Sequence, residues 1–229
     1  VEALLNAHKA GLVYLGTDLT YLNMNGKRTR TMLQGAMAGK TFNDDVWPDA
    51  NHQTVGFFTE WHKSFSPMWK AVGGVRADMF SSSAGTLDGL FFSTYGAFDD
   101  KQEVNPSANI RFVFEPKTNV EFALGVGHGA RSASITELYI NRLSVGLDRY
   151  EYLGNPTLDA EKNTQVELWH RVQFGKFSYD MTGFYSNLSD YISAVVNPDI
   201  PMLIPSMANG VKQFINIDKA YKYGGELST

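Results

Sequence analysis

Hydrophobic and polar residues alternate with a period of two along much of this chain, whereas the spacing of three and four that marks an amphipathic helix is nearly absent. Within residues 119–128, small or charged residues separate the apolar ones, which are Val120, Phe122, Leu124 and Val126. The same pattern predicts eight strands, each with one apolar and one polar face, over residues 13–21, 55–62, 69–79, 109–115, 119–128, 165–174, 177–185 and 221–228. Phe58 and Trp169 do not fit, because they interrupt this division of faces.

The connections between the predicted strands alternate in length. Short ones cover residues 66–68, 116–118 and 175–176, and long ones cover about 22–53, 80–108, 130–164 and 192–214. Strands of about ten residues with short turns at one end and long loops at the other are typical of outer-membrane β-barrels. Aromatic residues near the strand ends suit the interfacial rings of such barrels, namely Tyr21, Phe65, Trp69, Phe114, Phe174, Phe177 and Tyr191. The sequence therefore predicts an all-β chain that forms part of an antiparallel transmembrane β-barrel.

The alternation also predicts which side chains face the lumen of the barrel. Charged residues at alternate positions should point inward, namely Arg76, Asp78, Arg111, Glu121, Glu167 and Glu226. Apolar residues beside them should face lipid, namely Val75, Phe112, Phe122, Leu168 and Tyr223. A shift of one residue would invert the whole set. From the difference in length we expect the long loops outside the cell and the short turns in the periplasm.

Composition narrows the possible partners. The chain has 229 residues, of which 43% are hydrophobic and 13% aromatic, which suits a folded β protein. Its net charge of −4 gives no general attraction for nucleic acid. The absence of cysteine excludes disulfides and thiolate metal sites, and no apolar run is long enough for a transmembrane helix.

Patterns of catalytic residues are lacking. The paired carboxylates Asp44–Asp45 and Asp99–Asp100 lie in predicted loops, where solvated turns are their usual setting. The five histidines lack the spacing of a zinc-binding HExxH motif, and no Gly-x-Ser-x-Gly nucleophile elbow occurs. We therefore expect no enzyme.

Three segments, in this order, resemble elements of TonB-dependent outer-membrane receptors. ARSASITELY at residues 130–139 is similar to the family's Arg-x-Pro-x-x-x-Glu-Leu-Tyr element, and GNPTLDAEKNTQVELW at 154–169 to its Gly-Asn-Pro-x-Leu-x-Pro-Glu-Lys element. FINIDKAYKYGGEL at 214–227 is similar to its Asn-Ile-Asp-x-Ala-x-x-x-Gly-x-Glu element. Ala133 and Ala160 stand where the family commonly has proline, which loosens a turn but removes no chemical group.

Physical roles can be given to parts of these segments. Pro156 fixes its own φ and pushes Asn155 out of the α region, which directs a loop back toward the sheet. Gly224 and Gly225 let a strand pass close to bulk inside the barrel, with Glu226 facing the interior. We expect these residues to be structural rather than ligand-binding.

The resemblance implies a barrel of about 22 strands with an N-terminal plug domain in the outer membrane of a Gram-negative bacterium. It also implies uptake of scarce metal complexes, powered through the TonB complex of the inner membrane, and a barrel in contact with outer-membrane lipids and lipopolysaccharide. Eight strands make only about a third of such a barrel. We therefore expect residues 1–229 to be a partial transmembrane barrel domain without its plug and remaining strands.

The cargo is open between copper and a ferric siderophore, and no intrinsic cofactor is expected. Copper is suggested by thioether and imidazole groups in the predicted long loops, namely Met24, Met32, Met37, His52, Met202 and Met207. A siderophore would instead use aromatic and basic groups, for which the candidates are Tyr139, Arg142, Arg149 and Tyr150. Two other classes remain: a passive porin or structural barrel, and a soluble carbohydrate-binding β protein.

Overall fold

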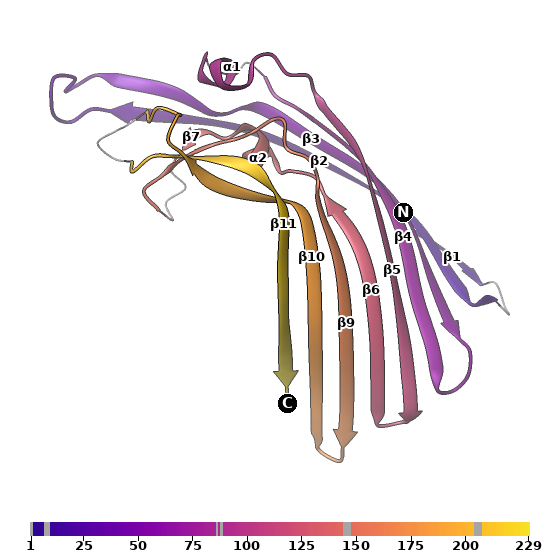
Figure 1. The fold of residues 1–229 in the computed structure, drawn as a ribbon. Coiled ribbons are helices and arrows are strands. Elements are labelled where there is room, and N and C mark those ends of the chain that lie inside the picture. Colours follow the sequence, from indigo (N-terminus) through magenta and orange to yellow (C-terminus); the bar gives the residue numbers. More distant parts are fainter. Residues whose placement is uncertain (1, 7–9, 86, 88, 144–147, 204–207) are drawn as a thin grey trace.

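The computed structural model describes residues 2–6, 10–85, 87, 89–143, 148–203 and 208–229. Their strands join into one curled 11-stranded sheet, in the spatial order β1-β2-β3-β4-β5-β6-β9-β10-β11-β8-β7 (Figure 1). The strands are β1 (Glu2–Asn6), β2 (Leu12–Thr31), β3 (Thr41–Ser64), β4 (Trp69–Ser83), β5 (Lys101–Lys117), β6 (Val120–Arg131), β7 (Asn141–Leu143), β8 (Glu151–Leu153), β9 (Glu161–Phe174), β10 (Phe177–Asn197) and β11 (Val211–Ser228). The described helices are α1 (Gly89–Tyr95) and α2 (Ile135–Tyr139), and neither is long and apolar enough to cross a membrane.

All eight predicted strands are present, and they are the eight longest strands of the sheet. Neighbouring long strands pair antiparallel, with the short turns at one end and the long connections at the other (Figure 1). The sequence pattern missed β1, β7 and β8, which have five, three and three residues and are too short to show a period. β8 pairs with β11 in parallel, so the connection between β6 and β9 returns to the sheet.

The predicted long loop over residues 22–53 is wrong for most of its length. In the structure β2 continues to Thr31 and β3 begins at Thr41, so this connection covers only residues 32–40. The other three long connections exist, but each is shorter at both ends than predicted, because the flanking strands continue.

Two features explain why the outer half of this hairpin shows no period-two pattern in the sequence. The register shifts between Met24 and Lys27, which breaks the alternation of faces. Beyond that point polar residues occupy both faces, and pairs such as Thr29 with Asn43 join the strands through side-chain hydrogen bonds. The hairpin therefore lacks the apolar face by which the other strands were recognised.

The pairing register confirms the predicted division of faces. Arg111, Gly125 and Glu167 are partners in one cross-strand row, so they point to the same side of the sheet. The next row contains Phe112, Leu124 and Leu168, which point to the other side. Followed through all the strand pairs, the register places the six residues predicted to point inward on the first face and the five predicted to meet lipid on the second. We call these the inner face and the outer face.

The inner face is the concave one, because side chains on it meet across an intervening strand. Arg76 of β4 reaches over β3 and donates to Asp18 of β2 at 2.7 Å. The Arg111 guanidinium of β5 lies 4.9 Å from the ring of Trp169 on β9, across β6. Trp169, which did not fit the sequence pattern, is thus held on the polar face by a cation–π contact.

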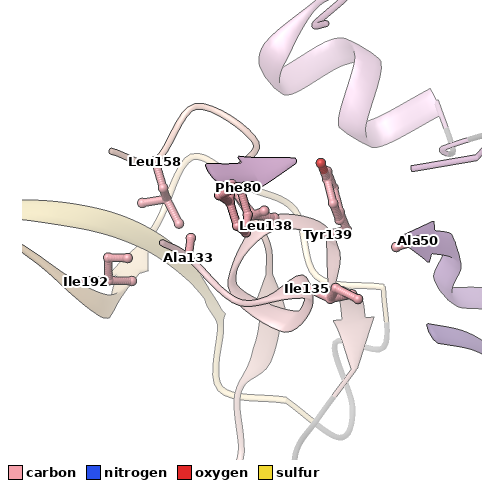
Figure 2. Close-up of a cluster of buried hydrophobic side chains, with 8 residues drawn as sticks. All are labelled: Ala50, Phe80, Ala133, Ile135, Leu138, Tyr139, Leu158 and Ile192. Atoms are coloured by element: carbon pink, nitrogen blue, oxygen red, sulfur yellow. The ribbon is translucent and has the colours of Figure 1, made fainter. Parts of the chain in front are cut away.

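Most buried side chains gather at the end with the long connections. One cluster contains Ala50, Phe80, Ala133, Ile135, Leu138, Tyr139, Leu158 and Ile192 (Figure 2). A second contains Leu87, Phe91, Leu153, Ile200 and Val211, and it anchors α1. The long connections thus pack over the inner face at this end of the sheet.

Candidate functional site

Residues 130–139 complete strand β6 and then form the capped helix α2, which is tied to the sheet. The Ser134 hydroxyl accepts a hydrogen bond from the Glu137 N–H, and the Glu137 carboxylate accepts one from the Ser134 N–H at 2.7 Å. Arg131 forms ion pairs with Glu137 at 2.8 Å and with Glu161 of β9 at 3.2 Å. Burial raises the pKa of Glu137, but the hydrogen bonds from Arg131 and Ser134 outweigh it, so the net pKa is lowered.

Residues 154–156 enter the core beside α2. A Cβ at Gly154 would lie 2.5 Å from the Leu138 carbonyl oxygen, so only glycine permits this approach. Asn155 donates through Nδ2 to the Phe214 carbonyl at 3.0 Å, and its Oδ1 accepts from the Thr157 N–H at 3.0 Å. This confirms that the Asn-Pro turn directs the chain back toward the sheet.

The third segment completes this arrangement through Asn216 of β11. Its Nδ2 donates to the carbonyls of Asp159 and Asp190, at 3.0 and 2.7 Å, and its Oδ1 accepts from the Asp159 N–H at 2.8 Å. We call the meeting place of residues 130–139, 154–161 and 214–216 the motif junction. Its polar side chains bond to backbone and to one another, which is the arrangement of a scaffold.

Of the predicted copper ligands, the structure places Met24 and His52 on the same face of neighbouring strands. The partner of Met24 is Ala50 and that of His52 is Leu22, so both side chains lie on the inner face in adjacent rows. Met24 packs on the buried cluster of Figure 2, and the His52 ring lies edge-on to Phe80 at 4.6 Å.

One ring nitrogen of His52 has no hydrogen-bond partner among the described residues. This nitrogen is the buried Nδ1, while Nε2 is 3.3 Å from the Thr54 hydroxyl. Burial lowers the pKa of His52, which favours the neutral imidazole that binds metals. An imidazole nitrogen beside a thioether is a donor set that suits copper.

The other predicted copper ligands lie elsewhere. Met32 and Met37 belong to the tip of the hairpin, and Met32 is eight residues beyond Met24, roughly 25 Å along an extended strand. Met202 packs against the cluster around Phe91, and Met207 lies outside the described residues. In the described part of the chain, no three His, Asp or Glu side chains come together as a metal site.

The predicted siderophore-binding residues divide into buried and accessible groups. Tyr139 is 1% exposed and packs in the cluster of Figure 2, so its ring does not face an open surface. Arg142 has a positive φ of 50°, and its carbonyl accepts a hydrogen bond from Arg28 at 3.2 Å. Arg149 is exposed, and the ring of Tyr150 lies 4.7 Å from Lys212 Nζ.

Lys212 joins this second group, although the sequence did not indicate it. Its ammonium group also lies 5.5 Å from the Tyr152 ring and hydrogen-bonds to Asp148. That hydrogen bond raises the pKa of Lys212 and lowers the pKa of Asp148. Only the parallel pairing of β8 with β11 brings Lys212 to these residues, so no local pattern could have revealed it.

Residues 4–229 match the family described as TonB dependent receptor-like, beta-barrel. The chain belongs to this family of receptor barrels. No protein with a curated description matches the sequence. The likeness stated from the three segments is therefore confirmed, and these segments meet at the motif junction.

Solved structures show the same receptor-barrel fold. The copper transporter OprC is similar with a TM-score of 0.71 and 18% identity, over 94% of this chain and 31% of that one. The hemophore receptor HasR of Serratia marcescens is similar with a TM-score of 0.67 and 16% identity, over 99% of this chain and 37% of that one. The ferric enterobactin receptor PfeA of Pseudomonas aeruginosa is similar with a TM-score of 0.63 and 19% identity, over 99% of this chain and 32% of that one. The chain thus spans about a third of each of these proteins, and identities this low show the fold alone.

Proposed function

We propose that this chain is part of the barrel of a receptor in the outer membrane of a Gram-negative bacterium, which takes up a scarce metal or metal complex by TonB-coupled transport. Membership of the receptor-barrel family carries the proposal. The plug, the remaining strands, the contact with the TonB complex, and the contacts with lipid and lipopolysaccharide are parts of it. Uptake by cells expressing the full-length protein should stop when the proton-motive force is collapsed. Uptake that continues would favour a passive porin.

The orientation can be tested on intact cells. The hairpin tip at residues 32–40 should lie outside the cell and the turns at Lys117 and Lys176 in the periplasm. A protease added to cells should therefore cut at the tip. Protection of the tip, with cleavage at the two lysines, would reverse the topology.

We infer that copper is the cargo, because Met24 pairs with Ala50, two residues from His52 on the same face, and the buried Nδ1 of His52 has no hydrogen-bond partner among the described residues. Thioethers bind Cu(I) without losing a proton, and burial lowers the pKa of His52, so this pair should lose less Cu(I) on mild acidification than an exposed imidazole would. The double variant Met24→Leu, His52→Gln should lose copper binding at this position. Met79→Leu, on the exposed outer face, is the matched control and should retain it. Equal binding by the double variant and the control would contradict copper recognition here.

A ferric siderophore is the second candidate, favoured by the cluster of Lys212, Tyr150 and Tyr152 beside the exposed Arg149. Cations and aromatic rings at one surface suit an anionic aromatic chelate. Arg149→Ala with Tyr150→Ala should then weaken uptake of a ferric catecholate and leave copper uptake unchanged. Saturable catecholate uptake by the wild type, without copper uptake, would replace the copper proposal.

A further inference from the structure

The inner face carries glycines whose place is explained by a neighbouring side chain. A Cβ at Gly16 would lie 2.2 Å from the ring of Phe58, and one at Gly224 would lie 2.9 Å from the ring of Phe184. In each case the large side chain of the next strand lies over the glycine, which also explains why Phe58 stands on a polar face. The same relation holds for Gly26 beneath Trp47 and Gly56 beneath Arg76.

Three glycines of β6 have no such cover. Gly125, Gly127 and Gly129 are alternate residues, and the pairing of Gly125 with Arg111 and Glu167 places all three on the inner face. A Cβ at these positions would meet its nearest atoms at 3.9, 3.7 and 3.7 Å, which is ordinary contact. None of the three has a positive φ. Neither packing within the described residues nor backbone conformation therefore requires glycine here.

These glycines form the bare floor of a groove of about 550 Å³ between β5 and β9. The floor is about 13 Å long, and the two walls are two strand spacings apart, or about 10 Å. The groove begins at the ion pair of Arg131 with Glu161 in the motif junction and descends between Asn109 and Gln165 toward Arg111. We call it the glycine groove.

The walls of the glycine groove carry polar and charged side chains, and the Arg111 guanidinium among them also lies against the ring of Trp169. Arg111 and Glu167 face each other across Gly125, and neither forms an ion pair in the described part of the chain. Asn163 Oδ1 is buried beneath the β9 wall and has no hydrogen-bond partner among the described residues.

We propose that the glycine groove is the part of the inner wall along which the cargo moves, and that it takes a hydrated metal ion or a compact polar metal complex. Amides and single charges of both signs give weak contacts at several places, which lets a solute enter and also leave. Glycines keep the floor free of side chains for the same reason. This proposal rests on the proposed transport function and adds the route to it.

The test uses the full-length receptor in cells, with Cu(I) and a ferric catecholate as separate probes. Gly127→Ala, Gly127→Val and Gly127→Phe should reduce uptake of the transported probe in order of side-chain size, at least tenfold for phenylalanine, while probe binding at the cell surface changes less than twofold. Gly183→Phe is the control, because Gly183 lies on the outer face with no atom within 4 Å of an added Cβ. Unchanged uptake by a folded Gly127→Phe receptor would overturn the proposal.

A second measurement covers the case in which Gly127→Phe fails to assemble. The chain has no cysteine, so the thiol of Gly127→Cys can be modified specifically in this segment after folding. A water-soluble thiol reagent should react and then block uptake. A thiol that does not react, or that reacts without effect on uptake, would overturn the groove as the route. A wild type that takes up neither probe would instead remove the transport function itself.

Discussion

At the end of the sheet with the long connections, Leu138 and Leu158 have exposed fractions of 0%, whereas Leu168 and Phe122 on the outer face are 62% and 43% exposed. The first pair is buried by other side chains, as in a soluble protein. The second pair has no protein above it in the described part of the chain and is suited to lipid. Apolar side chains thus have two different environments in this chain. The same kind of substitution should therefore have different effects in the two regions.

Shortening a leucine to alanine should give the largest difference in the free energy of unfolding between the buried cluster and the outer face. Leu138→Ala should lower the free energy of unfolding by about 2–5 kcal/mol, because it leaves a cavity in the cluster of Figure 2. Leu168→Ala should cost much less, because lipid chains fill the space. Urea unfolding of the full-length receptor in lipid vesicles would measure both. Equal losses would mean that the outer face is packed by protein after all.

An added charge should be tolerated on the inner face and should destabilise the outer face. Phe122→Arg puts a cation on the outer face and should cost about 2–4 kcal/mol near the middle of a bilayer, and less near its edge. Glu121→Arg, one residue away on the inner face, should cost far less. The amount of folded receptor in the outer membrane compares the two. Better assembly of Phe122→Arg than of Glu121→Arg would invert the faces.

The motif junction should depend on its cap. Ser134→Ala removes the hydroxyl that accepts from the Glu137 N–H and should cost about 0.5–2 kcal/mol. Ser134→Asp keeps an acceptor there and should restore most of the loss. Ser178→Ala, at an exposed site in β10, serves as the control. Amide exchange of residues 135–139 would report the change. If Ser134→Ala behaves like this control, packing alone stabilises α2.

The smallest expected effect is one of pH on the β2–β3 hairpin. Hydrogen bonds from Arg30, and then from Arg28, outweigh burial and hold the pKa of Asp44 below its ordinary value. A lowered folded pKa stabilises the protein above the unfolded value of about 3.9, and this contribution is lost as the pH falls through the folded pKa. The hairpin should therefore loosen below about pH 4.

Amide exchange of residues 28–44, compared with Asp44→Asn at each pH, would isolate this effect because intrinsic exchange rates cancel. The difference between the wild type and Asp44→Asn should shrink below about pH 4. Asp45→Asn, at an exposed carboxylate, should follow the wild type. A constant difference over the whole range would show that Asp44 acts through geometry rather than charge.

Most of the wall was predictable from sequence. Period-two alternation identified the eight long strands, and the charged positions fixed their inner and outer faces, because side chains of a strand alternate whatever surrounds them. The three receptor-like segments identified the family for a similar reason: each has a turn, a cap or a close approach that its own residues dictate. The capping box of Ser134 and Glu137 is one example.

What only the tertiary structure decided is which residues meet. The hairpin beyond Met24 has a shifted register and two polar faces, so its strands exist only through pairing with each other. Lys212 reaches Tyr150 through a parallel pairing that closes a connection of many residues, and Met32 and Met37 were separated from His52 by the length of the same hairpin. Gly125, Gly127 and Gly129 look like any glycines in the sequence, because whether a neighbour covers a glycine depends on the side chains of two other strands.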